Sequence, residues 1–265
     1  MNMYLYELKS IRKSAIIWVC VLIGLAALFL SVYPAMAKDA AGFKELLNNY
    51  PEKIRAMLGI NLDYIESILG FYSMIFSFIM LGGAIQAMNL GLSILSKETR
   101  ERTADFLLVK PVSRSAIVTA KLLAAFTTLL TTNIIFCVVS SIIANSVKLE
   151  DFSGKLFFMI NLTLFFLQLI FVALGVVISV FFNKLKSVLP ISLGIVVGLY
   201  MIGALFATSN DAARFISPFK YFDITYIIQN ASYETLYLFI SVVLVVVAVV
   251  ASYIIYIKKD IHAVS

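Results

Sequence analysis

The chain has 265 residues, of which 62% are hydrophobic and 14% are charged, and its formal net charge is +6. Soluble domains carry about 45–50% apolar and about 25% charged residues, so this composition excludes a water-soluble globular protein. The hydrophobicity also excludes a disordered chain, and the presence of only two cysteines excludes a disulfide-stabilised scaffold. We therefore predict an all-α membrane protein whose single transmembrane domain covers residues 1–265.

Six apolar stretches are long enough to cross a bilayer, which takes about 20 apolar residues. None of them contains Lys, Arg, Asp, Glu or His. The predicted spans are about 15–33, 71–95, 122–144, 156–182, 188–207 and 235–257.

The segment before the first span has Tyr4, Leu8 and Ile11 at helical spacing, with charged residues between them. This pattern predicts a short amphipathic helix in the membrane interface, and a simple basic flank is the alternative. The first apolar run ends near Ala35 and Ala37, which resemble a signal-peptide cleavage site. Its length of about 19 residues exceeds that of a signal sequence, so we predict an uncleaved first span.

The first outer loop, 34–70, contains Phe43, Leu46, Leu47 and Tyr50 at the i, i+3, i+4, i+7 spacing of an amphipathic helix. Pro51 ends this pattern, and a second apolar face follows it. Two interpretations remain open: the segment lies on the outer leaflet, or it caps a passage through the bundle.

The loop after the second span, 96–121, carries charges in its first half and then the compact apolar patch 106–109. Pro111 ends this helical stretch, and Ser113 is well placed to cap the next helix. A charged helix with an exposed apolar patch suits docking to a partner protein, and contact with the lipid interface is the alternative.

The sequence 101–121, ERTADFLLVKPVSRSAIVTAK, resembles the signature loop of ABC-2 type transporter permeases. That family typically shows Glu-Arg-Gly-Thr, an acidic residue, a leucine run, Pro-Val/Ile-Ser/Thr-Arg and a Lys. Here the glycine is missing, because Arg102 directly precedes Thr103. The resemblance implies a cytoplasmic coupling helix that fits a groove on a separate ATP-binding subunit. The matching residues are Glu101, Arg102, Thr103, Asp105, Phe106, Leu107, Leu108, Pro111, Ser113 and Arg114.

The later connections differ in character. The outer loop 145–155 is short, and the basic residues of 183–187 fit only a tight turn. The last outer loop, 208–234, is too apolar for a solvated loop and too interrupted for a span. Two short helices that re-enter the outer leaflet would satisfy its backbone, and the resemblance implies the same re-entrant element. An aromatic patch at the membrane interface is compatible with this arrangement.

The distribution of charge predicts the topology. Both ends of the chain and the loops after spans two and four hold 13 basic and 5 acidic residues, whereas the other three loops hold 8 basic and 10 acidic residues. Basic residues are retained on the cytoplasmic side, so both termini are expected there. The basic balance therefore reflects topology, and we expect no nucleic-acid partner.

The residue types that carry catalysis are missing from the spans. The chain has no P-loop motif, and His262 has no ligand cluster around it, so we expect neither ATP binding, nor a metal site, nor a catalytic residue in this chain. Ion-driven transporters usually place an ionisable residue in the bundle. A transporter without one needs outside power, so ATP and Mg are expected in a partner subunit.

Polar and small residues within the spans suggest contacts between helices. Buried amides serve as interhelical hydrogen-bonding groups or line a translocation path. Residues Gly83, Ala87 and Gly91, and also Gly194 and Gly198, are spaced four apart, which favours close helix packing within one chain or between two. The amides are Gln86, Asn89, Asn133, Asn161 and Gln168.

These observations predict the permease subunit of an ATP-driven ABC-2 type transporter, most simply an exporter, in a prokaryotic plasma membrane. The expected partners are an ABC ATPase, a second permease chain and membrane lipids. A membrane scaffold that binds cytoplasmic proteins without transport, and a secondary carrier that uses neutral polar groups, are the alternatives.

Overall fold

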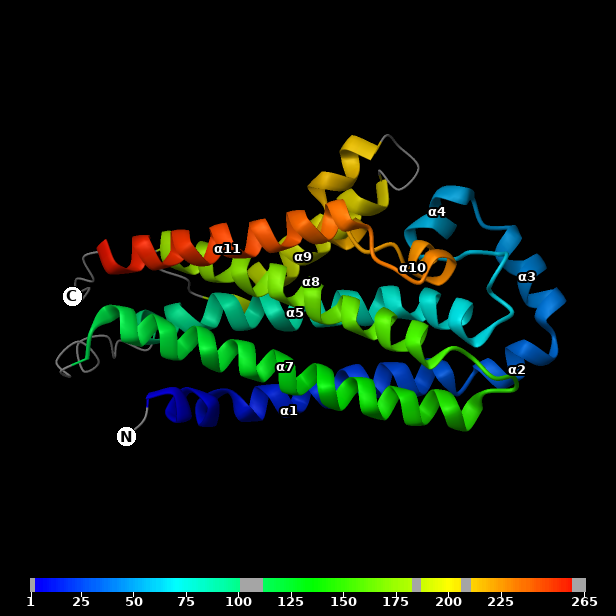
Figure 1. Cartoon of the computed structure of the whole chain (residues 1–265), viewed down its shortest axis with the longest axis horizontal. Helices are drawn as coiled ribbons and strands as arrows, with labels where there is room; N and C mark the ends of the chain where they lie inside the picture. Colours follow the sequence, from blue (N-terminus) through cyan, green and yellow to red (C-terminus); the bar gives the residue numbers. More distant parts are fainter. Residues whose placement is uncertain (1–2, 101–111, 183–186, 206–210, 259–265) are drawn as a thin grey trace.

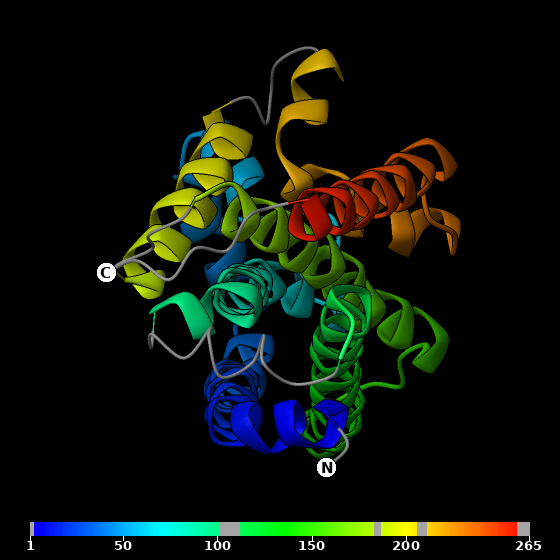
Figure 2. The ribbon, with the colours of Figure 1, turned by 90° about the vertical axis from the view of Figure 1, so that its left-hand side faces the viewer.

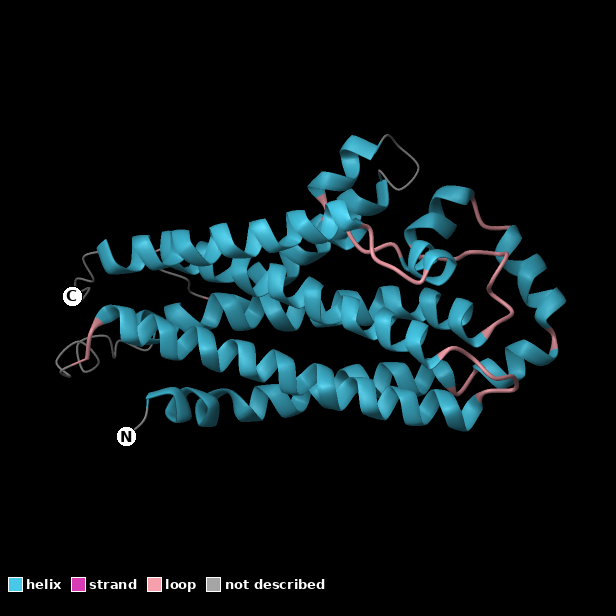
Figure 3. Cartoon of the chain, in the orientation of Figure 1, coloured by secondary structure: helices cyan, strands magenta, loops and turns pink. Residues whose placement is uncertain are grey.

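A computed structural model of the chain describes residues 3–100, 112–182, 187–205 and 211–258. These residues form helices and connecting loops, without a strand in any of the four ranges (Figure 3). Six helices are long and apolar enough to cross a membrane, which confirms the predicted all-α architecture with six spans. They are α1 (Met3–Leu30, continued by α2, Tyr33–Lys38), α5 (Ile68–Arg100), α7 (Arg114–Val147), α8 (Gly154–Phe181), α9 (Val188–Leu205) and α11 (Thr235–Lys258).

The long helices run along the same axis of the molecule (Figure 1). The start of α1, the end of α5, the start of α7 and the end of α11 lie at one end of the bundle. The short helices α2, α3 (Ala40–Asn48), α4 (Glu52–Met57) and α10 (Ile224–Asn230) lie at the other. The first described residue, Met3, and the last, Lys258, are therefore on the same side, as an even number of crossings requires.

Helices α5 and α8 form the centre of the bundle, and both are more buried than the other four spans. They pack most extensively against each other, while α1 packs on α7, α11 on α8 and α9 on α5. The packing of α5 on α8 is close because glycines meet there: a Cβ added to Gly91 would lie 2.3 Å from the carbonyl oxygen of Val172. By contrast, a Cβ on Gly194 or Gly198 of α9 would meet no atom of the described residues within 4 Å.

The predicted N-terminal helix is continuous with the first span, since α1 begins at Met3 and extends to Leu30. Figure 2, viewed along the bundle, shows the first turns of α1 lying across its end. The interfacial position of these turns stays a prediction, because it concerns the membrane.

The two outer loops contain short helices. Helices α3 and α4 lie on either side of Pro51, as the apolar spacing predicts. The last outer loop forms the 3₁₀ turns η1 (Asp211–Ile216) and η2 (Pro218–Lys220) and then α10. Helix α10 packs on α8 and α5, and η2 packs on α9 and α8. Whether these elements re-enter the membrane remains a prediction.

Side-chain caps fix the starts of several helices. The hydroxyl of Ser113 accepts a 3.2 Å hydrogen bond from Ala116 N, which confirms the predicted cap of α7. Asp223 caps α10 by accepting from Thr225 N at 2.8 Å and from Tyr226 N at 3.3 Å. Such caps satisfy amides that have no partner within the helix, so they define where the loops end.

Candidate functional site

The flanks of segment 101–111 are tied together at the end of the bundle that holds both chain ends. Helix α5 leads into this segment and α7 follows it, while the start of α1 and the end of α11 lie beside them (Figure 1). We call this region the loop base. Its interacting residues are Tyr4, Glu7, Ser10, Ile94, Lys97, Arg114, Thr119, Lys121, Thr127, Tyr253 and Ile257.

A buried ion pair lies at the centre of the loop base. Lys121 Nζ lies 3.2 Å from Glu7 Oε1, and it donates a 2.7 Å hydrogen bond to the carbonyl oxygen of Ile94. The side chain of Lys121 is 0% exposed and that of Glu7 is 3% exposed. Burying charges away from water is costly unless they are paired and hydrogen-bonded, and both conditions hold here. One ammonium group thus connects α7 to α1 and to α5.

Two further contacts connect α1 with its neighbours. Lys97 on α5 donates a hydrogen bond to the hydroxyl of Ser10, and the hydroxyl groups of Tyr4 and Thr127 lie 3.0 Å apart. The first three turns of α1 are therefore attached to the end of α5 and to α7 by polar contacts on both sides of the buried pair.

Helix α11 is connected to the start of α7. Arg114 Nη1 donates a 3.2 Å hydrogen bond to the carbonyl oxygen of Ile257, and the hydroxyl groups of Thr119 and Tyr253 form a second hydrogen bond. Beneath these contacts lies an apolar cluster to which α5, α7, α8 and α11 contribute. Movement of the start of α7 would therefore act on three other helices.

Two of the ten residues that match the signature motif are described. Ser113 caps α7, and Arg114 contacts the end of α11. The other eight lie outside the described residues, so their docking role stays a prediction. They are Glu101, Arg102, Thr103, Asp105, Phe106, Leu107, Leu108 and Pro111.

Three helices share a layer of side-chain amides in the middle of the bundle, which we call the amide layer. Asn133 Nδ2 on α7 donates to Gln168 Oε1 on α8 at 2.6 Å. Gln168 Nε2 donates to Gln86 Oε1 on α5 at 3.1 Å and to the carbonyl oxygen of Gly83 at 3.3 Å. Gln86 Nε2 in turn donates to Thr132 Oγ1 at 3.3 Å. The layer joins α5, α7 and α8 through groups that would be costly to leave unpaired in an apolar bundle.

The other two predicted amides lie apart from this layer. Asn161 on α8 accepts hydrogen bonds from Tyr72 at 3.0 Å and from Ser140 at 3.3 Å, which join the same three helices nearer their outer end. Asn89 is half-buried on α5, and within the described part of the chain it joins neither group.

Comparison with known protein families identifies the chain. Residues 1–261 match the family model described as ABC-2 family transporter protein. The chain belongs to the ABC-2 family. No curated protein matches it. An ABC-2 permease is a component of a membrane transporter rather than an enzyme, and its family implies association with an ABC ATPase subunit.

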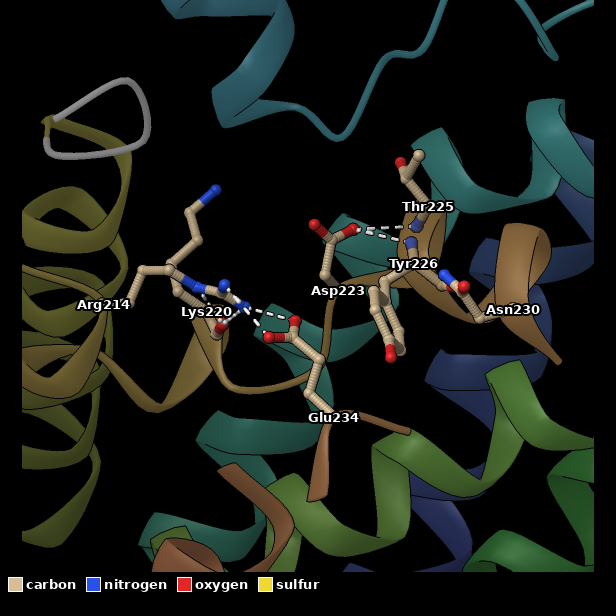
Figure 4. A network of polar contacts seen from close by, with 7 residues as sticks. All are labelled: Arg214, Lys220, Asp223, Thr225, Tyr226, Asn230 and Glu234. Atoms are coloured by element: carbon tan, nitrogen blue, oxygen red, sulfur yellow. Dashed lines mark hydrogen bonds and ion pairs between the residues drawn. The ribbon is translucent and has the colours of Figure 1, made fainter. Parts of the chain in front are cut away.

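An ion-pair cluster fixes the last outer loop of this ABC-2 protein to the start of α11 (Figure 4). The guanidinium of Arg214 forms two hydrogen bonds with Glu234, at 2.6 and 3.2 Å, and donates to the carbonyl oxygen of Lys220 at 3.1 Å. It also lies 4.2 Å above the ring of Tyr237. We call this arrangement the outer clamp, because a bidentate pair stacked on an aromatic ring has a fixed geometry.

Burial acts to lower the pKa of both Arg214 and Lys220, and the neighbouring charges decide the outcome for each. Burial alone would lower the pKa of Arg214, but the hydrogen bonds and negative charge of Glu234 outweigh it, so this pKa is raised. Burial lowers the pKa of Lys220, against the attraction of Asp223 and together with the repulsion of Arg214. Arg214 is therefore held firmly in its charged form.

The buried ion pair of the loop base was not anticipated from the ABC-2 sequence. The predicted span begins at Leu122, and Lys121 precedes it on the helix that Ser113 is predicted to cap; α7 includes Lys121 in its second turn. The sequence contains one indication of this pair, because Ile117, Lys121 and Ala125 are spaced four apart and therefore share a helical face. The structure shows that all three are buried. An isolated lysine on an apolar helical face predicts a buried partner of opposite charge.

No group of three or more His, Cys, Asp and Glu side chains that would suit a metal ion occurs among the described residues.

Proposed function

We propose that this ABC-2 protein is the permease subunit of an ATP-driven exporter in a prokaryotic plasma membrane. A separate ABC ATPase subunit binds ATP and Mg and docks on the loop 96–121. Two permease chains enclose the transport path. The excess of basic residues in both terminal segments and in the loops after spans two and four supports a cytoplasmic position for this end of the bundle, where ATP is available.

The loop base is the observation that supports this proposal. A docking segment can drive transport only if its movement reaches the spans, and both flanks of segment 101–111 are bonded to other helices. Through Lys121 they are connected to α1, and through Arg114 to α11. Specific polar contacts and an apolar cluster thus attach both flanks to the neighbouring helices.

The mechanism follows from these connections. Closure of the ATPase dimer displaces the coupling helix near Asp105–Pro111, and the loop base moves with it. Because the amide layer holds α5, α7 and α8 together, these helices move as a body, and α1 and α11 follow through the loop base. The cavity between the two permease chains then changes the side on which it is open.

Co-purification of an ATPase tests the proposal. The wild-type permease, solubilised gently from its native membrane, should bring with it a stoichiometric P-loop ATPase. The variants Phe106→Asp and Arg114→Glu should insert normally and lose that partner, because the first removes apolar contact and the second reverses a charge at the docking loop. Leu149→Asp, at an exposed apolar residue of the outer loop 145–155, is the matched control and should keep the ATPase.

Two results would contradict the proposal. An ATPase that stays bound to both loop variants would exclude docking through the loop 96–121. A stoichiometric partner without a P-loop would instead support the scaffold interpretation, in which the same loop binds a cytoplasmic protein without transport.

A further inference from the structure

The buried pair Glu7–Lys121 is the one ion pair of the described residues whose side chains are both almost fully shielded from solvent. It lies where three chain segments meet: the second turn of α1, the last turns of α5 and the second turn of α7. The last two are the flanks of segment 101–111. The pair therefore joins the N-terminal segment to both sides of the predicted docking loop.

Stability alone does not require charges at this position. Apolar residues of similar size are often as stabilising as a buried ion pair, and the loop base already contains an apolar cluster that includes Ile94, Ile117 and Val118. Apolar attraction, however, is non-directional, so it does not by itself fix one position of a helix against its neighbours. An ammonium bonded to a carboxylate and to a carbonyl oxygen at once has one geometry, because both distances must be kept.

The other contacts of α1 are less well placed to fix that geometry. The hydrogen bond between Lys97 and Ser10 is exposed, and the contact between Tyr4 and Thr127 is part-buried. Water can replace both partners of an exposed hydrogen bond at little cost, whereas no water replaces the partners of a fully buried lysine.

We propose that Glu7 and Lys121 are positioning residues that make the start of α1 and both flanks of the docking loop move as one body. The inference rests on the proposed function, since it assigns the route by which movement of the loop reaches the first span. Without the pair, the loop would still bind the ATPase, but its displacement would no longer carry α1 along.

Spin labels in the intact permease–ATPase complex test this inference without knowledge of the cargo. The labels are placed at Leu5→Cys on α1 and Leu123→Cys on α7, both of which are exposed, after Cys20→Ala and Cys137→Ala. The distance between the labels is measured by electron paramagnetic resonance with and without AMP-PNP and Mg. In the otherwise wild-type chain the distance should be the same in both states.

The variant Glu7→Leu/Lys121→Met replaces the pair by apolar residues of similar size. It should insert and bind the ATPase, and AMP-PNP should shift or broaden its distance distribution. The matched control is Lys148→Met/Asp151→Leu, which removes an exposed ion pair of 2.6 Å in the outer loop and should behave as wild type. Glu7→Gln, which keeps the size and one hydrogen-bond acceptor, provides a milder test and should give a smaller broadening.

The outcomes separate the two proposals. If the ATPase is bound and AMP-PNP leaves the distance of the double variant and of Glu7→Gln unchanged, the positioning role is wrong while the proposed function stands. If AMP-PNP already changes the distance between the labels in the otherwise wild-type chain, the positioning role is also wrong. If no ATPase accompanies the wild-type permease, the proposed function fails, and the role of the pair fails with it.

Discussion

Asn133 on α7 and Gln168 on α8 are joined by a hydrogen bond of 2.6 Å in the middle of the bundle. Gln168 extends this contact to α5, because its Nε2 donates to Gln86 and to the carbonyl oxygen of Gly83. Gln168 is 0% exposed, so its side-chain amide finds its hydrogen-bond partners among protein groups. One side chain on the central helix thus connects the two helices that flank the docking loop.

Replacing Gln168 by leucine should therefore destabilise the bundle. The substitution removes the bonds to Asn133, Gln86 and Gly83 at once. Gln86 Oε1 loses its described donor, whereas Asn133 Nδ2 keeps its bond to the carbonyl oxygen of Leu129. Each interhelical hydrogen bond in a membrane protein is worth about 0.6–2 kcal/mol, so the loss of three predicts a destabilisation of about 2–6 kcal/mol. The thermal unfolding midpoint of the detergent-solubilised permease measures this loss.

Asn145→Leu is the control for that experiment. Asn145 is also an amide on α7, but it is exposed and its described bond is to Ser141 of its own helix. Its replacement should change the midpoint little. If Gln168→Leu is as stable as Asn145→Leu, the amide layer does not hold the helices together, and a role in the transport path becomes the better explanation for these amides.

The outer clamp predicts a local effect on the last outer loop. Glu234→Leu removes the carboxylate that holds Arg214, while every tryptic site in the loop is kept. Bonds to charged groups contribute about 1.5–3 kcal/mol, and about 1.4 kcal/mol corresponds to a tenfold change in an equilibrium constant. Cleavage by trypsin after Lys220 should therefore accelerate at least tenfold.

Asp151→Leu provides the comparison, because it breaks an ion pair whose acidic member is 94% exposed. Surface pairs of this kind contribute little, so its cleavage rate should match wild type. Equal rates of tryptic cleavage in Glu234→Leu and wild type would show that apolar contacts hold the last outer loop in place and that the outer clamp is not needed.

A tyrosine beside the outer clamp predicts alkaline sensitivity. Burial raises the pKa of Tyr233 from 10.0 to about 12, and its hydroxyl donates a 2.9 Å hydrogen bond to the carbonyl oxygen of Met159. Because this pKa is higher in the folded than in the unfolded chain, its stabilising contribution is complete below pH 10 and is lost as the pH rises through 12. Unfolding midpoints measured from pH 8 to 12 should fall more steeply for wild type than for Tyr233→Phe.

At neutral pH the same variant should be less stable than wild type by about 0.5–1.5 kcal/mol, since one hydrogen bond is lost. Tyr50→Phe, at an exposed position of the first outer loop, should follow the wild-type pH profile throughout. Parallel profiles for Tyr233→Phe and wild type above pH 10 would show that this phenol does not contribute to the alkaline transition.

The elements that depend on local sequence were predictable. An apolar run of about 20 residues has one low-energy arrangement in a bilayer, so the six spans follow from composition alone. The cap at Ser113 and the separate helices on either side of Pro51 follow from equally local chemistry, because one hydroxyl satisfies a free amide and one proline ends a helix.

The contacts that join distant segments were not predictable in the same way. Glu7 and Lys121 are 114 positions apart in the chain, and nothing in either local pattern names the partner of the other. The helical pattern shows only that Lys121 shares a face with buried apolar residues. The pairing follows from the packing of α1 on α7, which no local pattern of the sequence reveals.

The small-residue patterns show the same limit and provide the last prediction. Residues Gly83, Ala87 and Gly91 on α5, and Gly194 and Gly198 on α9, have the same spacing, yet among the described residues only the first set lies at a close contact between helices. A Cβ on Gly91 would lie 2.3 Å from the carbonyl oxygen of Val172 and 3.1 Å from the Cα of Gly175. Backbone atoms cannot yield as flexible side chains do, so Gly91→Ala must push α5 away from α8.

Gly91→Ala should accordingly lower the stability of the permease by about 1–3 kcal/mol, the usual cost of overpacking a well-packed core. Gly194→Ala is the matched control: its Cβ would meet no described atom within 4 Å, and alanine favours a helix over glycine by about 0.5–1 kcal/mol. Its midpoint should be equal to or above wild type. Because the two variants add the same methyl group to helices of the same bundle, equal midpoints would mean that α5 and α8 are not in close backbone contact.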